Sequence, residues 1–259
     1  MSLEKKMPVI FVGHGSPMNA IEDNIFNSGW KQLGGELVKP KAILCISAHW
    51  VTDSTRITAM QFPKTIHDFY GFTDELYSRE YHCPGAPELA KLTKELTTVT
   101  KSELDYKWGL DHGAWSVLLP MYPNADVPVY QLSLNQNMTP KQHYELGKEL
   151  VSLRNQGVLI IGSGNIVHNL RMMNSRNEVY DWANEFDTHV KSAIDKADHQ
   201  SIIGYESLGV MSKYSVPTSE HFLPLLYVMS LVGEGESIEY FNEGFDYGSI
   251  SMRSVVFGK

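Results

Sequence analysis

The chain has 259 residues, of which 42% are hydrophobic and 20% charged. This is ordinary usage for a folded protein and excludes a disordered, collagen-like or coiled-coil chain. There are 22 Lys and Arg against 30 Asp and Glu, so the net charge is −8. Because no dense basic cluster is present to displace counterions from a phosphate backbone, we expect no nucleic-acid partner.

No apolar run approaches the ~20 residues needed to cross a bilayer, and the hydrophobic stretch near Met1 is too short for a signal peptide. We therefore expect no membrane partner and a cytoplasmic location. The two cysteines, Cys45 and Cys83, are too few for a disulfide framework.

Short apolar runs alternate with helical patterns along the chain, as in α/β proteins. Strands are predicted at Pro8–Val12, Ala42–Ser47, Arg56–Met60, Val127–Leu132, Val158–Ile161 and Ile250–Phe257. The first two runs are too uniformly apolar for a sheet with one solvated face and should be central strands. Helices are predicted at Ala86–Leu96, at Pro140–Arg154 after a Thr139 N-cap, at Val179–Ala197 and at Ser219–Val232.

The stretch Gln61–Pro84 is rich in aromatics, Pro, Gly and His but has no clear period, so it is expected to be a long loop or a lid. No repeat or linker marks a boundary. Residues 1–259 are therefore predicted to form a single α/β domain with a central, mostly parallel mixed sheet flanked by helices.

Three of the ten histidines follow buried strands. His14 comes after PVIFVG, His49 after AILCISA, and His168 a few residues after VLIIGSG. In open α/β sheets the ligand crevice lies beyond the carboxyl ends of the strands, so these side chains can converge if the strands are neighbours. Since imidazole is the commonest metal ligand in proteins, the pattern predicts a metal site there.

Two further histidines lie in suggestive contexts. His221 follows a Thr218 or Ser219 cap and is expected at a helix start, and His112 lies in GLDHGAW, which we interpret as a loop. The others are expected to be less informative: His143, His189 and His199 are predicted at the solvated surface, whereas His67 and His82 could line a pocket.

Other motifs of catalysis are incomplete. After the Gly-Ser-Gly that begins at Gly162, Val167 stands where a dinucleotide fingerprint needs its third glycine, and no Walker loop occurs. Neither Ser16 nor Ser163 lies in G-x-S-x-G, so a serine hydrolase is a minor option.

Six motifs, in order GHGSPMNAIEDN, SAHW, TIHDFYGF, DHGAW, SGNIVHNL and TSEHFLPLLY, resemble those of the class III extradiol ring-cleavage dioxygenases. The resemblance runs from about Pro8 to Phe257 and is greatest to the 4,5-DOPA extradiol dioxygenases. It implies a single α/β domain, one mononuclear metal, and opening of a catechol ring by O2. Fe(II) is expected for catalysis, with Zn(II) as an alternative occupant that lacks redox chemistry.

Carried over by motif, the resemblance makes His14, His49 and His221 metal ligands. It makes His168 the acid/base residue and, in zinc-loaded proteins, a possible fourth ligand. It also implies that His112 faces the pocket for substrate and oxygen. Related iron enzymes often use two histidines and one carboxylate, so the neighbouring Glu220 leaves the third ligand open. The alternatives to a dioxygenase are a zinc hydrolase with His168 as proton shuttle and a non-catalytic metal-binding protein.

Overall fold

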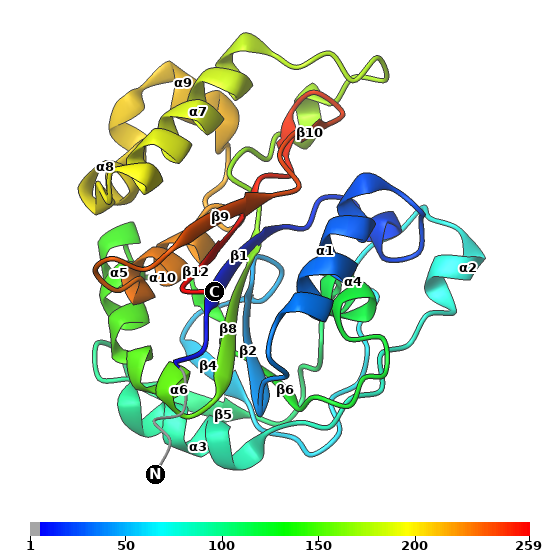
Figure 1. Ribbon diagram of the computed structural model, residues 1–259, viewed down its shortest axis with the longest axis vertical. Helices are drawn as coiled ribbons and strands as arrows, with labels where there is room; N and C mark the ends of the chain where they lie inside the picture. The colour runs from blue at the N-terminus through cyan, green and yellow to red at the C-terminus, as the bar shows by residue number, and fades with distance from the viewer. Residues whose placement is uncertain (1–5) are drawn as a thin grey trace.

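The computed structural model describes residues 6–259, so residues 1–5 of the predicted domain lie outside the described part. At its centre is a six-stranded sheet in the order β6-β2-β8-β1-β12-β9 (Figure 1). Four neighbouring strands are parallel: β6 (Val129–Gln131), β2 (Ala42–Ser47), β8 (Val158–Gly164) and β1 (Val9–Gly13). Then β12 (Ser254–Phe257) runs antiparallel to β1, and β9 (Ile238–Phe241) antiparallel to β12. The predicted α/β fold with a mostly parallel mixed sheet is confirmed.

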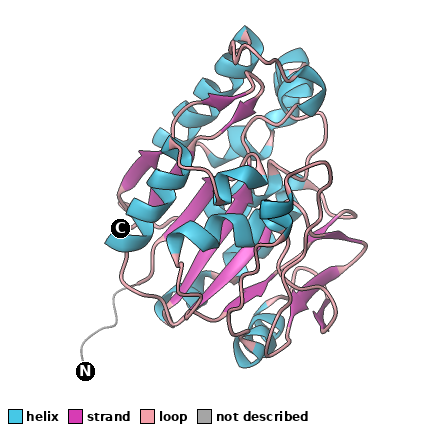
Figure 2. Cartoon of the chain, turned by 90° about the vertical axis from the view of Figure 1, so that its right-hand side faces the viewer, coloured by secondary structure: helices cyan, strands magenta, loops and turns pink. Residues whose placement is uncertain are grey.

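The sheet is buried on both faces because successive side chains of each strand point to opposite sides. Val9 and Phe11 of β1 join one hydrophobic cluster, whereas Ile10 and Val12 join the other. The first cluster includes residues of α5 (Pro140–Glu149), α7 (Asp181–Asp195) and α10 (Leu223–Leu231). The second includes residues of α1 (Ile25–Glu36) and α4 (His112–Met121). Figure 2 shows the strands behind helices on the side that faces the viewer.

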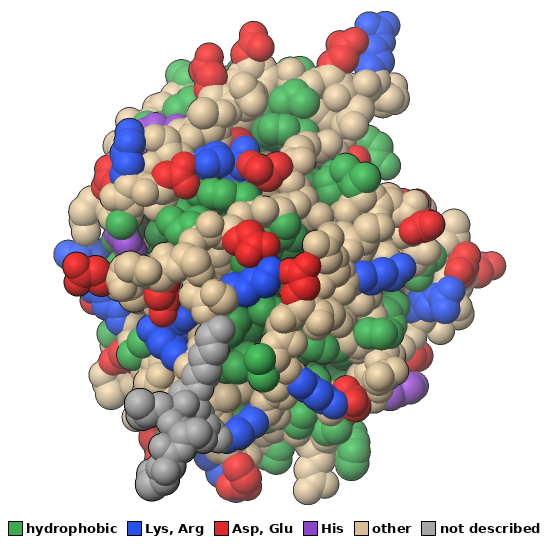
Figure 3. All heavy atoms as spheres, in the orientation of Figure 1, with side chains coloured by type: hydrophobic (Ala, Val, Ile, Leu, Met, Phe, Trp, Pro, Cys, Tyr) green, Lys and Arg blue, Asp and Glu red, His purple; other side chains and the backbone are tan. Residues whose placement is uncertain are grey.

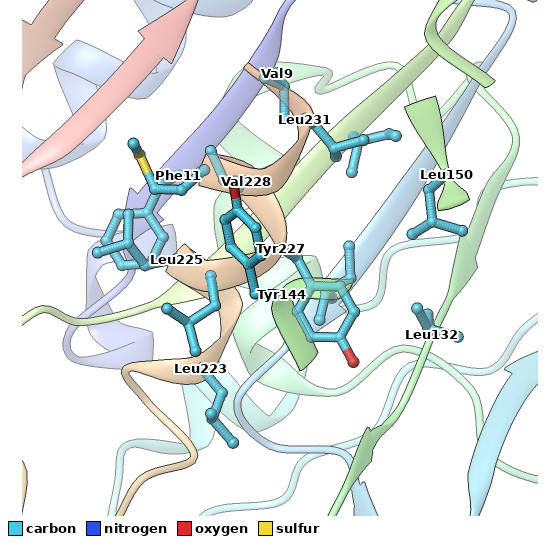
Figure 4. Close-up of a cluster of buried hydrophobic side chains, with 14 of the residues drawn as sticks. Val9, Phe11, Leu132, Tyr144, Leu150, Leu223, Leu225, Tyr227, Val228 and Leu231 are labelled. Carbon is cyan, nitrogen blue, oxygen red and sulfur yellow. The ribbon is translucent and has the colours of Figure 1, made fainter. Parts of the chain in front are cut away.

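Helix α10 lies in the middle of the first cluster, where it packs on β1, β8 and α5 (Figure 4). Eight of its nine residues are buried, and all of the nine except Ser230 are apolar or aromatic, as expected for a helix without a solvated face. This packing fixes the N-terminal end of α10, directly after His221 and Phe222, at the carboxyl end of the sheet.

The remaining elements surround this core. The paired short strands are β3 (Val51–Thr52) with β7 (Leu134–Asn135), β4 (Thr55–Thr58) with β5 (Ser102–Asp105), and β10 (Phe245–Asp246) with β11 (Ile250–Ser251). The remaining α-helices are α2 (Asp74–Tyr77), α3 (Pro87–Leu96), α6 (Val151–Asn155), α8 (His199–Ile203) and α9 (Val210–Ser215). Three 3-10 turns cover Pro17–Ala20, Leu170–Met172 and Tyr205–Leu208.

Several predicted boundaries need correction. The helix predicted at Pro140–Arg154 breaks at Leu150 into α5 and α6, and the strand predicted at Ile250–Phe257 is divided between β11 and β12. Helix α4 was not predicted, because nine of its ten residues are buried and no apolar period marks a face. The stretch from residue 61 to 84 is irregular apart from α2, as expected for a long loop.

The surface visible in Figure 3 shows no dense cluster of basic side chains among residues 6–259, as the sequence predicts. On the face drawn in Figure 3, acidic and basic side chains are interspersed, and little histidine is visible. Within residues 6–259, none of the helices combines the length and apolar character needed to cross a membrane.

Candidate metal centre

Five histidines from distant parts of the chain gather beyond the carboxyl end of the sheet. The ring centroids of His14, His49 and His221 are 5.0 to 5.3 Å apart, and His112 lies 3.8 Å from His49. The ring of His168 stacks on that of His221 at 3.5 Å. The convergence expected from the strand ends is therefore confirmed, since β2, β8 and β1 are neighbours.

The backbone brings these side chains together in a defined way. His14 directly follows β1, and His49 lies two residues after β2. His112 is the first residue of α4, where Asp111 caps the helix, so its predicted loop position is wrong. The chain around His221 passes so close to β8 that a Cβ on Gly164 would lie 2.1 Å from the carbonyl oxygen of His221. Only glycine fits at that position of the strand.

The hydrogen bonds of His14 fix which of its nitrogens carries a proton. Its Nδ1 lies 3.0 Å from the hydroxyl of Ser163, and that hydroxyl donates its proton to the carbonyl oxygen of Gly113 at 2.5 Å. A serine hydroxyl has one proton, so it must accept from His14 Nδ1. His14 Nε2 therefore presents a lone pair to the centre.

Asp68 lies beside two more of the rings. Its Oδ2 lies 3.0 Å from His112 Nδ1 and 3.3 Å from His49 Nδ1. Burial alone would raise the pKa of Asp68, but its hydrogen bonds from His112 and the nearby imidazoles hold that pKa below the usual value. Because an ionised carboxylate only accepts, the His112 ring carries its proton on Nδ1.

His221 is held in the same way by its neighbour Glu220, whose Oε1 lies 3.2 Å from His221 Nδ1. The same carboxylate oxygen accepts from the hydroxyl of Thr218. His221 Nε2 is buried and has no hydrogen-bond partner among residues 6–259. Glu220 therefore contacts the Nδ1 side of the His221 ring and leaves Nε2 on the opposite side.

These observations fit a metal ion. The Nε2 atoms of His14 and His49 lie 3.0 Å apart, and neither has a proton to share if both rings are protonated on Nδ1. Two lone pairs facing each other at this distance suit ligands of one cation. Burial, with the neighbouring imidazoles adding to it, lowers the pKa of His14 and His221 well below the usual value and that of His49 to about 3. The rings are thus neutral, as metal ligands must be.

His112 also belongs to the candidate ligand set. One nitrogen of each of His14, His49 and His112 can be chosen so that all three atoms lie within 4.8 Å of one another. This cluster is consistent with a mononuclear metal site. Burial lowers the pKa of His168 to about 4, so His168 is a neutral imidazole beside the cluster.

The other histidines lie elsewhere. His143 is fully buried and bonds through Nδ1 to the hydroxyl of Tyr227 at 2.9 Å, so its predicted surface position is wrong. His199 and His189 are half-buried, and His82 is exposed. His67 is half-buried and contacts the carbonyl of Arg79 and nearby aromatic rings.

Sequence reasoning did not identify Asp68 and Ser163 as supports of the centre. Asp68 follows His67 in an irregular stretch, where no period shows which way a side chain points. The sequence suggests Ser163 only as a candidate nucleophile. The one signal in the sequence is its position near the carboxyl end of a buried strand, one residue before Gly164.

Comparisons with known proteins agree with this architecture. The model of the family described as "Catalytic LigB subunit of aromatic ring-opening dioxygenase" matches residues 8–258. The chain is 42% identical to the 4,5-DOPA dioxygenase extradiol of Escherichia coli (strain K12), over 98% of this chain and 95% of that protein. It is 39% identical to the protein of the same name from Beta vulgaris, over 95% of each. The crystal structure of an uncharacterized protein from Escherichia coli K12 matches with a TM-score of 0.85 and 39% identity, over 97% of this chain and 100% of that one.

The fold and the histidine cluster thus define an α/β enzyme with a candidate metal site at the carboxyl edge of its sheet. The chain belongs to the LigB family of aromatic ring-opening dioxygenases, in the group of the 4,5-DOPA extradiol dioxygenases. It is an extradiol dioxygenase, with an aromatic catechol-type compound and O2 as substrates. This membership favours the dioxygenase over the hydrolase and the non-catalytic alternative.

Proposed function

We propose that this enzyme opens the ring of L-DOPA or a closely related catechol, using Fe(II) held by His14, His49 and His221. The observation that carries the ligand assignment is the convergence of the three rings, whose centroids are 5.0 to 5.3 Å apart and whose Nδ1 atoms each lie beside a polar side chain. The names of the relatives from Escherichia coli and Beta vulgaris support L-DOPA as the first substrate to test.

A bound Fe(II) ion supplies open coordination positions and the redox chemistry that ring opening needs. The chain supplies proton transfer. We assign this role to His168, because it stands against His221 as a neutral imidazole able to accept a hydroxyl proton of the catechol and return it later. Such a group typically contributes ~10² to 10⁴-fold to rate.

His112 is assigned to the substrate side of the centre. It touches His49, and the ring of Phe69 packs near it with centroids 5.6 Å apart. An aromatic substrate that entered here would meet an imidazole edge and a phenyl ring. A single catalytic domain over residues 1–259 and a cytoplasmic location stay predictions.

The test is anaerobic reconstitution of the metal-free protein with Fe(II), addition of L-DOPA, and admission of oxygen. We expect oxygen uptake together with a yellow semialdehyde product, and no uptake by the Zn(II)-loaded protein because Zn(II) has no redox chemistry. Absence of uptake with L-DOPA and every other catechol tested would contradict the proposal.

Three variants assign the roles. His14→Ala and His49→Ala should lose metal, whereas His168→Ala should keep substantial metal and lose most of its turnover. The exposed His82 provides the control, since His82→Ala removes an imidazole that is not part of the cluster. A His168→Ala enzyme with full turnover would remove His168 from the proton-transfer role.

A further inference from the structure

The segment that carries Asp68 is irregular, but it is fastened to the beginning of α4. The indole nitrogen of Trp115 donates to the carbonyl oxygen of Ile66 at 2.9 Å, and the backbone N–H of Ile66 donates to the carbonyl oxygen of Leu110 at 2.8 Å. Asp68, two residues further on, is therefore presented to the histidine cluster from a fixed backbone.

Two N–H groups of His112 donate to the carboxylate of Asp68, and a ring nitrogen of His49 lies beside it. Its Oδ1 accepts from the backbone N–H of His112 at 2.8 Å, and its Oδ2 faces Nδ1 of both His112 and His49. The side chain is only 18% exposed. A carboxylate has only acceptor atoms, so it can hold both N–H groups of His112 and still face the His49 ring as an acceptor.

We propose that Asp68 is a positioning residue that holds His49 and His112 as a pair, with the proton of each ring on Nδ1 and the Nε2 lone pair turned toward the centre. This inference rests on the proposed metal site. One carboxylate then fixes the orientation and the proton position of both a metal ligand, His49, and the ring beside the substrate, His112. It also makes His112 Nε2 an acceptor, suited to a substrate hydroxyl or to the metal itself.

A purely structural role makes a different prediction. If Asp68 served only to fasten its segment through the backbone N–H of His112, the ring protons would not depend on it. The location of the ring protons is therefore the decisive quantity, and it can be measured without metal or turnover.

The experiment uses the metal-free protein labelled with ¹⁵N-histidine, in which NMR distinguishes rings protonated on Nδ1 from rings protonated on Nε2. In the unchanged protein we expect His14, His49 and His112 all to be protonated on Nδ1. In Asp68→Ala, His49 and His112 should lose this single tautomer. His14 should keep it, because its acceptor is Ser163.

Zinc affinity, measured by competition with a chelator, gives the second readout. Loss of an outer-shell partner typically costs ~10 to 100-fold in metal affinity, and we expect Asp68→Ala to fall in this range. The matched control is Asp53→Ala, since the side chain of Asp53 is 72% exposed and, among residues 6–259, pairs only with Arg56 and Ser54. Its tautomers and zinc affinity should not change.

If Asp68→Ala also disturbs the His14 signal, the centre has collapsed and Asp68→Asn decides. Its oxygen can accept from the backbone N–H of His112 while its NH₂ group faces the two rings, which selects the opposite tautomer in both. A folded Asp68→Asn or Asp68→Ala protein with unchanged tautomers and unchanged zinc affinity would overturn the proposal. That result would leave the dioxygenase assignment standing, because no catechol enters the measurement.

Discussion

Replacing Gly164 by Ala tests how closely the centre depends on backbone packing. The added Cβ would lie 2.1 Å from the carbonyl oxygen of His221, whereas ordinary contact begins at 3.4 Å. The carbonyl must therefore retreat by about 1.3 Å. It also accepts a hydrogen bond from the backbone N–H of Asn165 at 2.9 Å, so its movement strains a second contact. No side-chain rotation can relieve a clash with backbone.

Overpacking of this kind typically costs ~1 to 3 kcal/mol of folding free energy. The larger effect should be on function, because a misplacement of about 1 Å can cost ~10²-fold in rate. We expect Gly164→Ala to lower the urea midpoint, to weaken zinc binding in chelator competition, and to reduce oxygen uptake with L-DOPA.

Gly35 of α1 is the control, because a Cβ there would meet no atom within 4 Å. Gly35→Ala should be stabilised by roughly 0.5 to 1 kcal/mol, since alanine loses less backbone entropy in a helix. A Gly164→Ala protein with wild-type stability and zinc affinity would refute the argument that this contact positions His221.

Three further outcomes follow from single contacts. Ser163→Ala removes the acceptor of His14 Nδ1 and should weaken zinc binding by ~10 to 100-fold in chelator competition; equal affinity would contradict the role given to that hydroxyl. Burial lowers the pKa of His143 from 6.5 to about 4, so the unfolded chain binds more protons between these values. Stability should thus fall as pH drops from 6.5 to 4, by up to about 3 kcal/mol, and the urea midpoint of His143→Gln, which has no imidazole, should depend less on pH. Leu225→Ala empties a fully buried site in α10 (Figure 4) and should cost ~2 to 5 kcal/mol by urea unfolding; a smaller loss would mean that the core around α10 can collapse.

The sheet was predictable from sequence because its central strands are buried on both faces. The predicted strand Ala42–Ser47 has the observed bounds, since a short uninterrupted apolar run is typical of a strand buried on both faces. The same reasoning failed for α4, which is buried nearly all round and shows no helical face. An amphipathic period needs a solvated side, and α4 does not have one.

The candidate site was predictable where side chains follow strands and not where they are held by loops. His14 and His49 are placed by the ends of β1 and β2, and adjacent parallel strands bring such positions together. The support from Asp68 depends on how the segment from residue 61 to 84 docks on α4, and that is decided by long-range backbone hydrogen bonds. The spacing of residues along the sequence does not reveal these long-range hydrogen bonds.

The arrangement of lone pairs explains why the centre needs support from so many directions. When both rings carry their proton on Nδ1 and no cation is bound, the Nε2 atoms of His14 and His49 face each other at 3.0 Å as two lone pairs and repel. A rotation that turned one nitrogen away would relieve the repulsion. Ser163 and Asp68 oppose that rotation by binding the opposite side of each ring. The packed sheet and the docked segment thus hold a donor set that is unfavourable alone, and a divalent cation removes the repulsion. Ion binding should therefore stabilise the native state relative to the unfolded chain, where no such set exists.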